Sequence, residues 1–255
     1  MQERVNLLKQ ALQDNTAAIG LWCSLSSALT TEIVAGAGAD WLLIDSEHSP
    51  NDLRSIVAQL QVAAAFPCEA AVRVPSDDPV FIKQVMDGGA RSLMVPNIRT
   101  ADQARAVVAA MAYAPGGIRG FSVGHRANAF GRIANYHANA RAQQLLAVQI
   151  ECETGVANAA EIAAVPGVDV LFVGPGDLST NMGAMGSPNA PHVQAAIASV
   201  LAATRAAGKA AGILAPQRAD ADRYLADGFT MVAVGSDLGL LARGSDQLVA
   251  QFRKG

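Results

Sequence analysis

The 255-residue sequence contains few of the residues on which several classes of protein depend. Only three cysteines are present (Cys23, Cys68 and Cys152), and no two of them have the CxxC spacing. Scattered cysteines in odd number predict neither a disulfide framework nor a thiolate zinc site. Aromatic residues make up 5% of the chain, which leaves little for a surface that stacks nucleic-acid bases.

Charge and long apolar runs are also scarce. The net charge is -3 and the isoelectric point is about 5.8, which argues against a nucleic-acid partner or a basic membrane-facing surface. No apolar run approaches the roughly 20 residues that span a bilayer, and the first residues lack the apolar region of a signal peptide. We therefore expect a cytoplasmic globular protein with a small-molecule partner and no nucleic-acid or membrane partner.

A helix, a glycine turn and a short apolar strand recur along the chain. Glycine turns at residues 38–40, 88–90, 166–169 and 227–229 precede the runs WLLID, SLMVP, VLFVGP and MVAVG. Glycine readily adopts the left-handed conformation that ends a helix. With four further apolar runs, the sequence predicts eight strands, at residues 19–25, 41–45, 70–74, 92–96, 145–150, 170–175, 211–215 and 231–235.

Helix-like stretches separate most of these strands. The apolar residues at 53, 56, 57, 60 and 64 recur with the helical period, and similar stretches lie at residues 79–86, 101–111, 157–164, 191–207 and 219–225. Eight strands alternating with helices over about 250 residues are typical of a single-domain (β/α)8 (TIM) barrel. A doubly wound open sheet is the alternative, but no GxGxxG motif follows the first strand.

The stretch 113–144 lacks a clear period. A connection of this length in a compact domain is usually functional or disordered. Its arginines and histidines predict either an anion-handling lid or an ordinary solvated loop; they are Arg119, His125, Arg126, Arg132 and His137.

Acid-base residues follow the buried run Trp-Leu-Leu-Ile directly, at Asp45, Glu47 and His48. The C-terminal ends of barrel strands hold the active site, so these side chains are candidates for catalysis. His48 is the natural general base because its ordinary pKa lies near working pH, and Asp45 is close enough to orient it. The alternative is a solvated loop with a helix cap and an unrelated histidine.

Two carboxylates, Glu151 and Asp177, follow the fifth and sixth strands, and Glu151 shares a face with Gln149. Hard oxygen ligands suit Mg²⁺ or Mn²⁺. The glycines before Asp177 expose backbone N–H groups to a ligand carboxylate or phosphate. Alternatively, Asp177 caps a helix and Glu151 pairs with an arginine.

Arg73 ends the third strand, where a guanidinium can stabilise a developing oxyanion or form an ordinary ion pair. An imine-forming aldolase needs a buried lysine in the barrel. None of the four lysines follows a strand, which favours a metal-dependent route; they are Lys9, Lys83, Lys209 and Lys254.

The motifs LLIDSEHSPND, VRVP, DGGARSLMVP, YAPGGIRGFSVGHRAN, VQIE and VGPGDLS lie in this order between residues 20 and 241. In them the chain strongly resembles the HpcH/HpaI family of metal-dependent (class II) pyruvate aldolases. The stretches GFSVGHRANAFG, GILAPQRADADRYL and VAVGSDLG are most similar to the branch that acts on 2-dehydro-3-deoxyglucarate, also called 5-keto-4-deoxy-D-glucarate.

The resemblance implies a role for each matching residue. It assigns His48 as proton acceptor, Arg73 as transition-state stabiliser, and Glu151 and Asp177 as ligands of a divalent metal, most simply Mg²⁺, with Mn²⁺ or Co²⁺ possible. Asp87 matches a carboxylate that reaches the site from a neighbouring subunit and raises the basicity of the histidine. This implies a homohexamer built from two trimers, with the C-terminal helix packed on a neighbouring subunit.

The substrate contacts follow in the same way. The pyruvate portion would be held by Gln149, Gly176 and Asp177, although alanine or serine is more usual at position 176. A cationic lid that includes Arg126 would handle a distal carboxylate. The remaining candidates for substrate contact are Trp22 and Leu214, at the ends of the first and seventh strands, and Ser122.

The implied reaction is a reversible retro-aldol cleavage of a 2-keto-3-deoxy sugar acid, with 5-keto-4-deoxy-D-glucarate as the best candidate, to pyruvate and tartronate semialdehyde. The pyruvate enolate would be stabilised by the metal and Arg73. One alternative is the same chemistry on another acceptor, as in 4-hydroxy-2-oxoheptanedioate or 2-keto-3-deoxy-L-rhamnonate. Others are a related barrel lyase acting on acyl-CoA or phosphoenolpyruvate, and a non-catalytic binding module.

Overall fold

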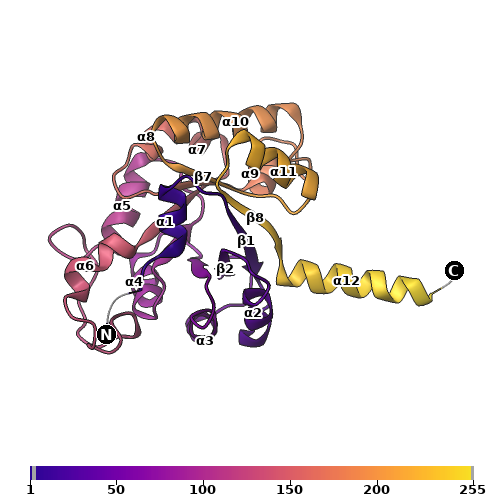
Figure 1. Ribbon diagram of the computed structural model, residues 1–255. Helices are drawn as coiled ribbons and strands as arrows, with labels where there is room; N and C mark the ends of the chain where they lie inside the picture. The colour runs from indigo at the N-terminus through magenta and orange to yellow at the C-terminus, as the bar shows by residue number, and fades with distance from the viewer. Residues whose placement is uncertain (2–3, 254–255) are drawn as a thin grey trace.

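The computed structural model describes Met1 and residues 4–253, so Lys254 lies outside the described residues. Eight parallel strands form a closed barrel in chain order (Figure 1). Their bounds are β1 Ala18–Cys23, β2 Trp41–Asp45, β3 Glu69–Arg73, β4 Ser92–Val95, β5 Leu145–Ile150, β6 Val170–Val173, β7 Ala210–Leu214 and β8 Met231–Ser236. The predicted (β/α)8 barrel is confirmed, and every predicted strand overlaps an observed one.

Helices surround the barrel. They are α1 Leu7–Gln13, α2 Ala28–Ala35, α3 Leu53–Ala63, α4 Pro79–Asp87, α5 Ala101–Met111, the 3-10 turn η1 Arg126–Asn128, α6 Tyr136–Gln143, α7 Glu153–Ala157, α8 Ala159–Ala163, α9 Pro175–Asn181, α10 Pro191–Ala206, α11 Arg218–Asp227 and α12 Asp237–Phe252. The predicted helices are present, and α2 is the helix expected before the glycine turn at residues 38–40. The elements that were not predicted are α1, η1, α6, α7 and α9. Helix α6, inside the stretch that lacks a period, buries only Tyr136 and Ala140, so its sequence shows no apolar stripe.

The barrel interior is filled by inward-facing side chains, while the opposite strand faces pack against the helices. Three inward rings form what we call the aromatic floor: Trp22, Trp41 and Phe172, with centroids 5.8–6.3 Å apart. Gly20 makes room for it, because a Cβ there would lie 2.1 Å from the Trp41 ring. Leu8 of α1 belongs to the same cluster and covers the N-terminal end. The C-terminal ends of the strands, the barrel mouth, carry the polar residues.

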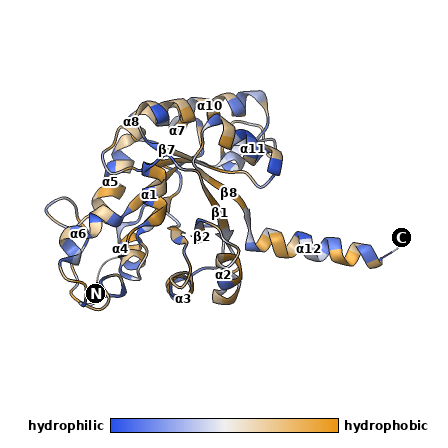
Figure 2. Cartoon of the chain, in the orientation of Figure 1, coloured by the Kyte–Doolittle hydropathy of each residue, from blue (hydrophilic) through white to orange (hydrophobic). Residues whose placement is uncertain are grey.

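Helix α12 leaves the barrel and extends away from it (Figure 1). Its first residue, Asp237, is buried and accepts a hydrogen bond from Ser24 N at 2.8 Å, and no later residue of the helix is buried. Figure 2 shows hydrophobic residues along the projecting helix, and its large exposed apolar side chains are Leu238, Leu240, Leu241, Leu248, Val249 and Phe252. None of the described helices is long and apolar enough to cross a membrane.

Candidate active site

A buried ion pair between neighbouring strands lies at the centre of the barrel mouth. Asp45 and Arg73 are opposite each other in the β2–β3 register. Arg73 Nε and Nη2 donate to the two oxygens of Asp45 at 2.7 and 2.8 Å, and its Nη1 lies 2.8 Å from Glu47 Oε2. Burial opposes the charge of Arg73, but the hydrogen bonds and charge of Asp45, with Glu47, outweigh it and raise its pKa. The guanidinium is therefore a fixed cation.

His48 lies beside this pair, on the turn that follows β2. Its side chain is 65% exposed, and its Nε2 is 3.9 Å from Glu47 Oε2. Asp45, which we expected to orient the histidine, has both oxygens occupied by Arg73. Glu47 is the acid that pairs with His48 among the described contacts, and the role of Asp45 in orienting His48 stays a prediction.

Two carboxylates follow β5 and β6 at the same mouth, Glu151 directly after β5 and Asp177 in the first turn of α9. Glu151 Oε1 accepts from Asn97 N at 2.7 Å, and its Oε2 accepts from Gln149 Nε2 at 3.2 Å. Burial, then the charges of Glu47 and Asp177, raise the pKa of Glu151 to about 7. A Cβ on Gly174 would lie 2.7 Å from Glu151 Oε2, so only glycine leaves space for this carboxylate.

The other residues expected around the substrate fall into two groups. Gln149 Oε1 lies 3.4 Å from Arg73 Nη1, and Leu214 packs in the same interior cluster as Trp22, whose ring is 5.6 Å from the Arg73 guanidinium. These three surround the pair. Gly176 is exposed in the first turn of α9, with open space where a Cβ would stand, so alanine or serine would also fit.

Asp87 is not at the mouth of its own barrel. It ends α4, which returns from the C-terminal end of β3 to the N-terminal start of β4. Arg119 Nη2 donates to its Oδ1 at 2.6 Å, and His125 Nε2 lies 3.9 Å from the same oxygen. The Arg119 guanidinium stacks 4.5 Å over Tyr113 and is buried. The stretch after α5 thus holds Asp87 at the opposite end.

Ser122 and Arg126, both expected near the substrate, also lie away from this mouth. The carbonyl of Ser122 accepts from His137 Nε2 at 3.0 Å. Arg126 Nη1 donates to the carbonyl of Gly88, before β4, at 3.0 Å. Within one chain, then, the cationic stretch does not cover the mouth.

Comparison with known proteins gives this geometry a family context. Residues 18–244 match the HpcH/HpaI aldolase/citrate lyase family. The chain belongs to this family. The resemblance noted in the motifs is thereby confirmed, and the protein is a carbon–carbon lyase of the metal-dependent pyruvate aldolase class, acting on small molecules.

Relatives in the family carry different substrate names. The chain is 49% identical to a 4-hydroxy-2-oxovalerate aldolase of Rhodococcus jostii over 253 residues, covering 99% of this chain and 98% of the relative. It is 44% identical to a 5-keto-4-deoxy-D-glucarate aldolase of Klebsiella pneumoniae, with 98% and 97% covered. The crystal structure of a family protein from Burkholderia cenocepacia superposes with a TM-score of 0.95 at 42% identity, with 98% and 100% covered.

The donors present fit the divalent metal that the family implies. Among residues 4–253 no group of three or more His, Cys, Asp or Glu side chains forms a cage. Mg²⁺ commonly binds one or two carboxylates and completes its shell with water and substrate. Glu151 and Asp177 supply such a pair. Burial, then the charges of Glu47 and Asp177, raise the pKa of Glu151, and a bound cation would favour its ionised form.

Three contacts were not predicted from the sequence: Glu47 with Arg73, Asn97 with Glu151, and Asp87 with Arg119, which the sequence indicated only as part of the cationic stretch. Asn97 has a left-handed backbone (φ 55) that directs its N–H to Glu151. Asparagine tolerates this conformation, and an asparagine directly after a predicted strand was the available signal. Nothing in the spacing indicates that Arg119 pairs with Asp87, because the two are 32 residues apart.

Proposed function

We propose that the enzyme cleaves a 2-keto-3-deoxy sugar acid reversibly to pyruvate and an aldehyde, with 5-keto-4-deoxy-D-glucarate as substrate and tartronate semialdehyde as the second product. The observation that carries the proposal is the buried Arg73 guanidinium, fixed by Asp45 and Glu47 beside Glu151. The motifs of this branch and the 44% identity to a 5-keto-4-deoxy-D-glucarate aldolase support the choice of substrate.

Each side chain at the mouth has a task in this reaction. His48, exposed on its turn, accepts the proton of the C4 hydroxyl directly or through a water. Arg73 donates hydrogen bonds to Asp45 and Gln149 and forms an ion pair with Glu47, which leaves Nη hydrogens without an acceptor in the described chain. We assign one of them to the enolate oxygen, which it stabilises as the C3–C4 bond breaks. Gln149 and the backbone at Gly176 orient the pyruvate portion.

Glu151 and Asp177 hold the cation, for which we propose Mg²⁺ with Mn²⁺ or Co²⁺ as alternatives. When bound, it supplies Lewis-acid polarisation of the keto acid. The ligand Glu151 keeps its position because Asn97 and Gln149 each donate a hydrogen bond to one of its oxygens. Such supporting donors fix the direction of a ligand carboxylate.

The active unit in this proposal is a homohexamer built from two trimers. Asp87 cannot reach His48 in its own chain because α4 carries it to the opposite barrel end. A neighbouring chain that presents its Asp87, held by Arg119, would complete each site. The exposed apolar side chains of α12, and Leu29 and Ile33 exposed on α2, supply surfaces for such packing.

A pyruvate-release assay tests the proposed reaction. 5-Keto-4-deoxy-D-glucarate should be cleaved faster than 4-hydroxy-2-oxoheptanedioate and 2-keto-3-deoxy-L-rhamnonate at equal concentration. EDTA should abolish activity and Mg²⁺, Mn²⁺ or Co²⁺ should restore it. Faster cleavage of either of the other two keto acids would overturn the choice of substrate, and trapping of pyruvate on a lysine by borohydride would overturn the metal-dependent route.

Subunit mixing tests the shared site. His48→Ala and Asp87→Asn chains should each be impaired alone, but co-expression should restore about a quarter of wild-type activity, because random assembly places intact groups together in that fraction of sites. The matched control pairs His48→Ala with Asp102→Asn, an exposed carboxylate on α5, and should give about half. If Asp87 acts within its own chain, the first mixture gains nothing over the separate variants.

A further inference from the structure

A second cavity, of about 530 Å³, lies at the barrel end opposite the candidate active site. Its walls come from the end of α3 (Leu60), the start of β3 (Glu69), the turn before β4 (Gly89) and residues 126–136, with Arg4 at its edge. These lining residues lie before the N-terminal ends of the strands, whereas the candidate catalytic side chains lie after the C-terminal ends. The volume lies within the roughly 300–1,000 Å³ typical of small-molecule sites.

Guanidinium groups dominate the charge of this cavity. Arg91 is neutralised by Glu69, with Nη2 to Oε2 at 2.6 Å and Nε to Oε1 at 3.0 Å. Among residues 4–253, no carboxylate lies within ion-pair distance of the other three arginines that line it. They donate instead to backbone carbonyls: Arg4 to Ala64 at 2.8 Å, Arg126 to Gly88 at 3.0 Å and Arg132 to Ala129 at 3.1 Å.

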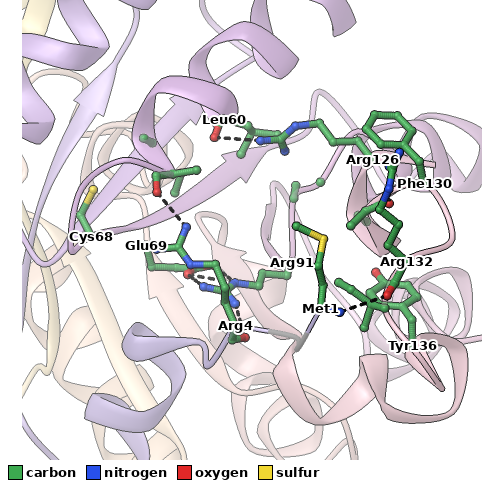
Figure 3. A pocket seen from close by; sticks show the side chains of 18 residues that line it. Met1, Arg4, Leu60, Cys68, Glu69, Arg91, Arg126, Phe130, Arg132 and Tyr136 are labelled. Atoms are coloured by element: carbon green, nitrogen blue, oxygen red, sulfur yellow. Dashed lines mark hydrogen bonds and ion pairs between the residues drawn. The ribbon is translucent and has the colours of Figure 1, made fainter.

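Arg126 is the most informative of these groups. It is half-buried, and burial lowers its pKa with no carboxylate to offset the effect. Carbonyl dipoles compensate a desolvated charge only in part, so an anion near this guanidinium would be stabilised. Figure 3 shows Arg126 extending across one side of the cavity, with Arg4 and Arg91 on the other side.

The rest of the lining is mostly apolar. It includes Leu60, Ala63, Ala90 and Ile133, with the Phe130 ring at the rim, 65% exposed. A fully hydrated inorganic ion would gain little from these walls, whereas a carboxylate with a hydrocarbon or aromatic body would bury that body against them. Within residues 4–253, the cavity therefore combines arginines that have no carboxylate partner with an apolar wall.

We propose that this cavity is a second ligand site, which binds a small organic carboxylate with an apolar body. The carboxylate lies between Arg126 and Arg4, and the apolar body lies against Leu60, Ala63 and Ile133. Within one chain the cavity is separate from the mouth, because Arg73, Glu151 and Asp177 do not line it.

Calorimetric titration of the EDTA-treated enzyme tests the proposal without any activity readout. The probe 3-phenylpropionate should bind at one site per chain, and both its neutral amide and inorganic phosphate should bind at least roughly tenfold more weakly, as expected for the loss of a charged hydrogen bond or of apolar burial. Equal binding of the amide, equal binding of phosphate, or no binding of 3-phenylpropionate would each overturn the proposal.

Variants then locate the site. Arg126→Met and Arg4→Met should each weaken 3-phenylpropionate binding by roughly tenfold, whereas Arg105→Met, which removes an exposed arginine of α5, should leave it unchanged. Thermal melts by circular dichroism report folding, and Arg4→Met keeps the test decisive if Arg126→Met does not fold. If folded Arg126→Met and Arg4→Met both bound 3-phenylpropionate as tightly as the wild type, the proposed location of the site would be wrong.

Discussion

Replacing Arg73 with methionine should lower kcat/KM for pyruvate release by roughly 10²–10³, the usual effect of losing one preorganised group that stabilises an oxyanion. The expectation rests on the fixed position of the guanidinium, which Asp45 holds through two hydrogen bonds and Glu47 through an ion pair. Because the stabilisation belongs to the transition state, kcat should fall more than KM rises. Steady-state kinetics on the preferred keto acid measure both constants.

The same substitution should also destabilise the protein, since it leaves the Asp45 carboxylate buried without its partner. Removal of one member of a buried pair costs about 3–5 kcal/mol in free energy of unfolding. Adding Asp45→Asn should recover part of this loss in denaturant titrations while activity stays low. Arg54→Met, an exposed position on α3, is the matched control and should change neither quantity. Recovery of activity in the double variant would contradict the role of Arg73.

The second large effect concerns Glu151 and the metal. Glutamine at this position should weaken binding of Mn²⁺ at pH 8 by at least about 100-fold, since it removes a charged ligand held by two donors. The exposed Glu161→Gln on α8 is the matched control and should bind like wild type. Mn²⁺ titrations followed by calorimetry and by activity measure the affinity of each protein for the metal.

The pH dependence of metal binding follows from the pKa of Glu151. Burial, with Glu47 and Asp177, raises this pKa to about 7, so below pH 7 the metal must displace a proton. The apparent Kd for metal should rise about tenfold per pH unit below 7 and level off above it. Glu151→Gln should flatten this dependence. If the apparent Kd of the variant still rose tenfold per pH unit, the displaced proton would belong to a group other than Glu151.

The free energy of unfolding of the metal-free protein should depend on pH in the opposite direction to metal affinity, because Glu151 makes the folded state more stable at low pH. The pKa of Glu151 is higher in the folded chain than its ordinary value of 4.5, so the folded state binds a proton more tightly than the unfolded state. This contribution to stability is present at pH values below 4.5 and is lost as pH rises towards 7. Bound metal removes the penalty at neutral pH, because it neutralises the ionised carboxylate.

The eight strands could be predicted because a strand buried on both faces reads as a continuous apolar run, and glycine turns mark where four of them begin. The positions of Glu151 and Arg73 at the mouth follow from the same pattern together with side-chain alternation. The bounds of helix α2 could not be predicted in this way, since its sequence Ala-Leu-Thr-Thr-Glu-Ile-Val-Ala has no clear polar face. The local sequence pattern therefore predicts the barrel and the residues at the ends of its strands.

The pairing between side chains could not be predicted, because it depends on register and on the path of loops. Asp45 is three residues from His48 but lies opposite Arg73 across two strands, and that register decides its partner. Arg126 carries the charge expected of a lid, yet the chain directs it towards Gly88 at the other barrel end. Sequence distance is a poor guide to contact in both cases.

The aromatic floor of Trp22, Trp41 and Phe172 has a kinetic consequence. Because these rings and Leu8 pack together and fill the barrel interior, the products leave through the barrel mouth and not through the N-terminal end. The fragment beside Arg73 and Gln149 lies deeper than the fragment at the exposed His48. In the proposed reaction the aldehyde therefore departs first and pyruvate last. Added pyruvate should accordingly inhibit competitively against the keto acid, whereas added aldehyde should inhibit noncompetitively.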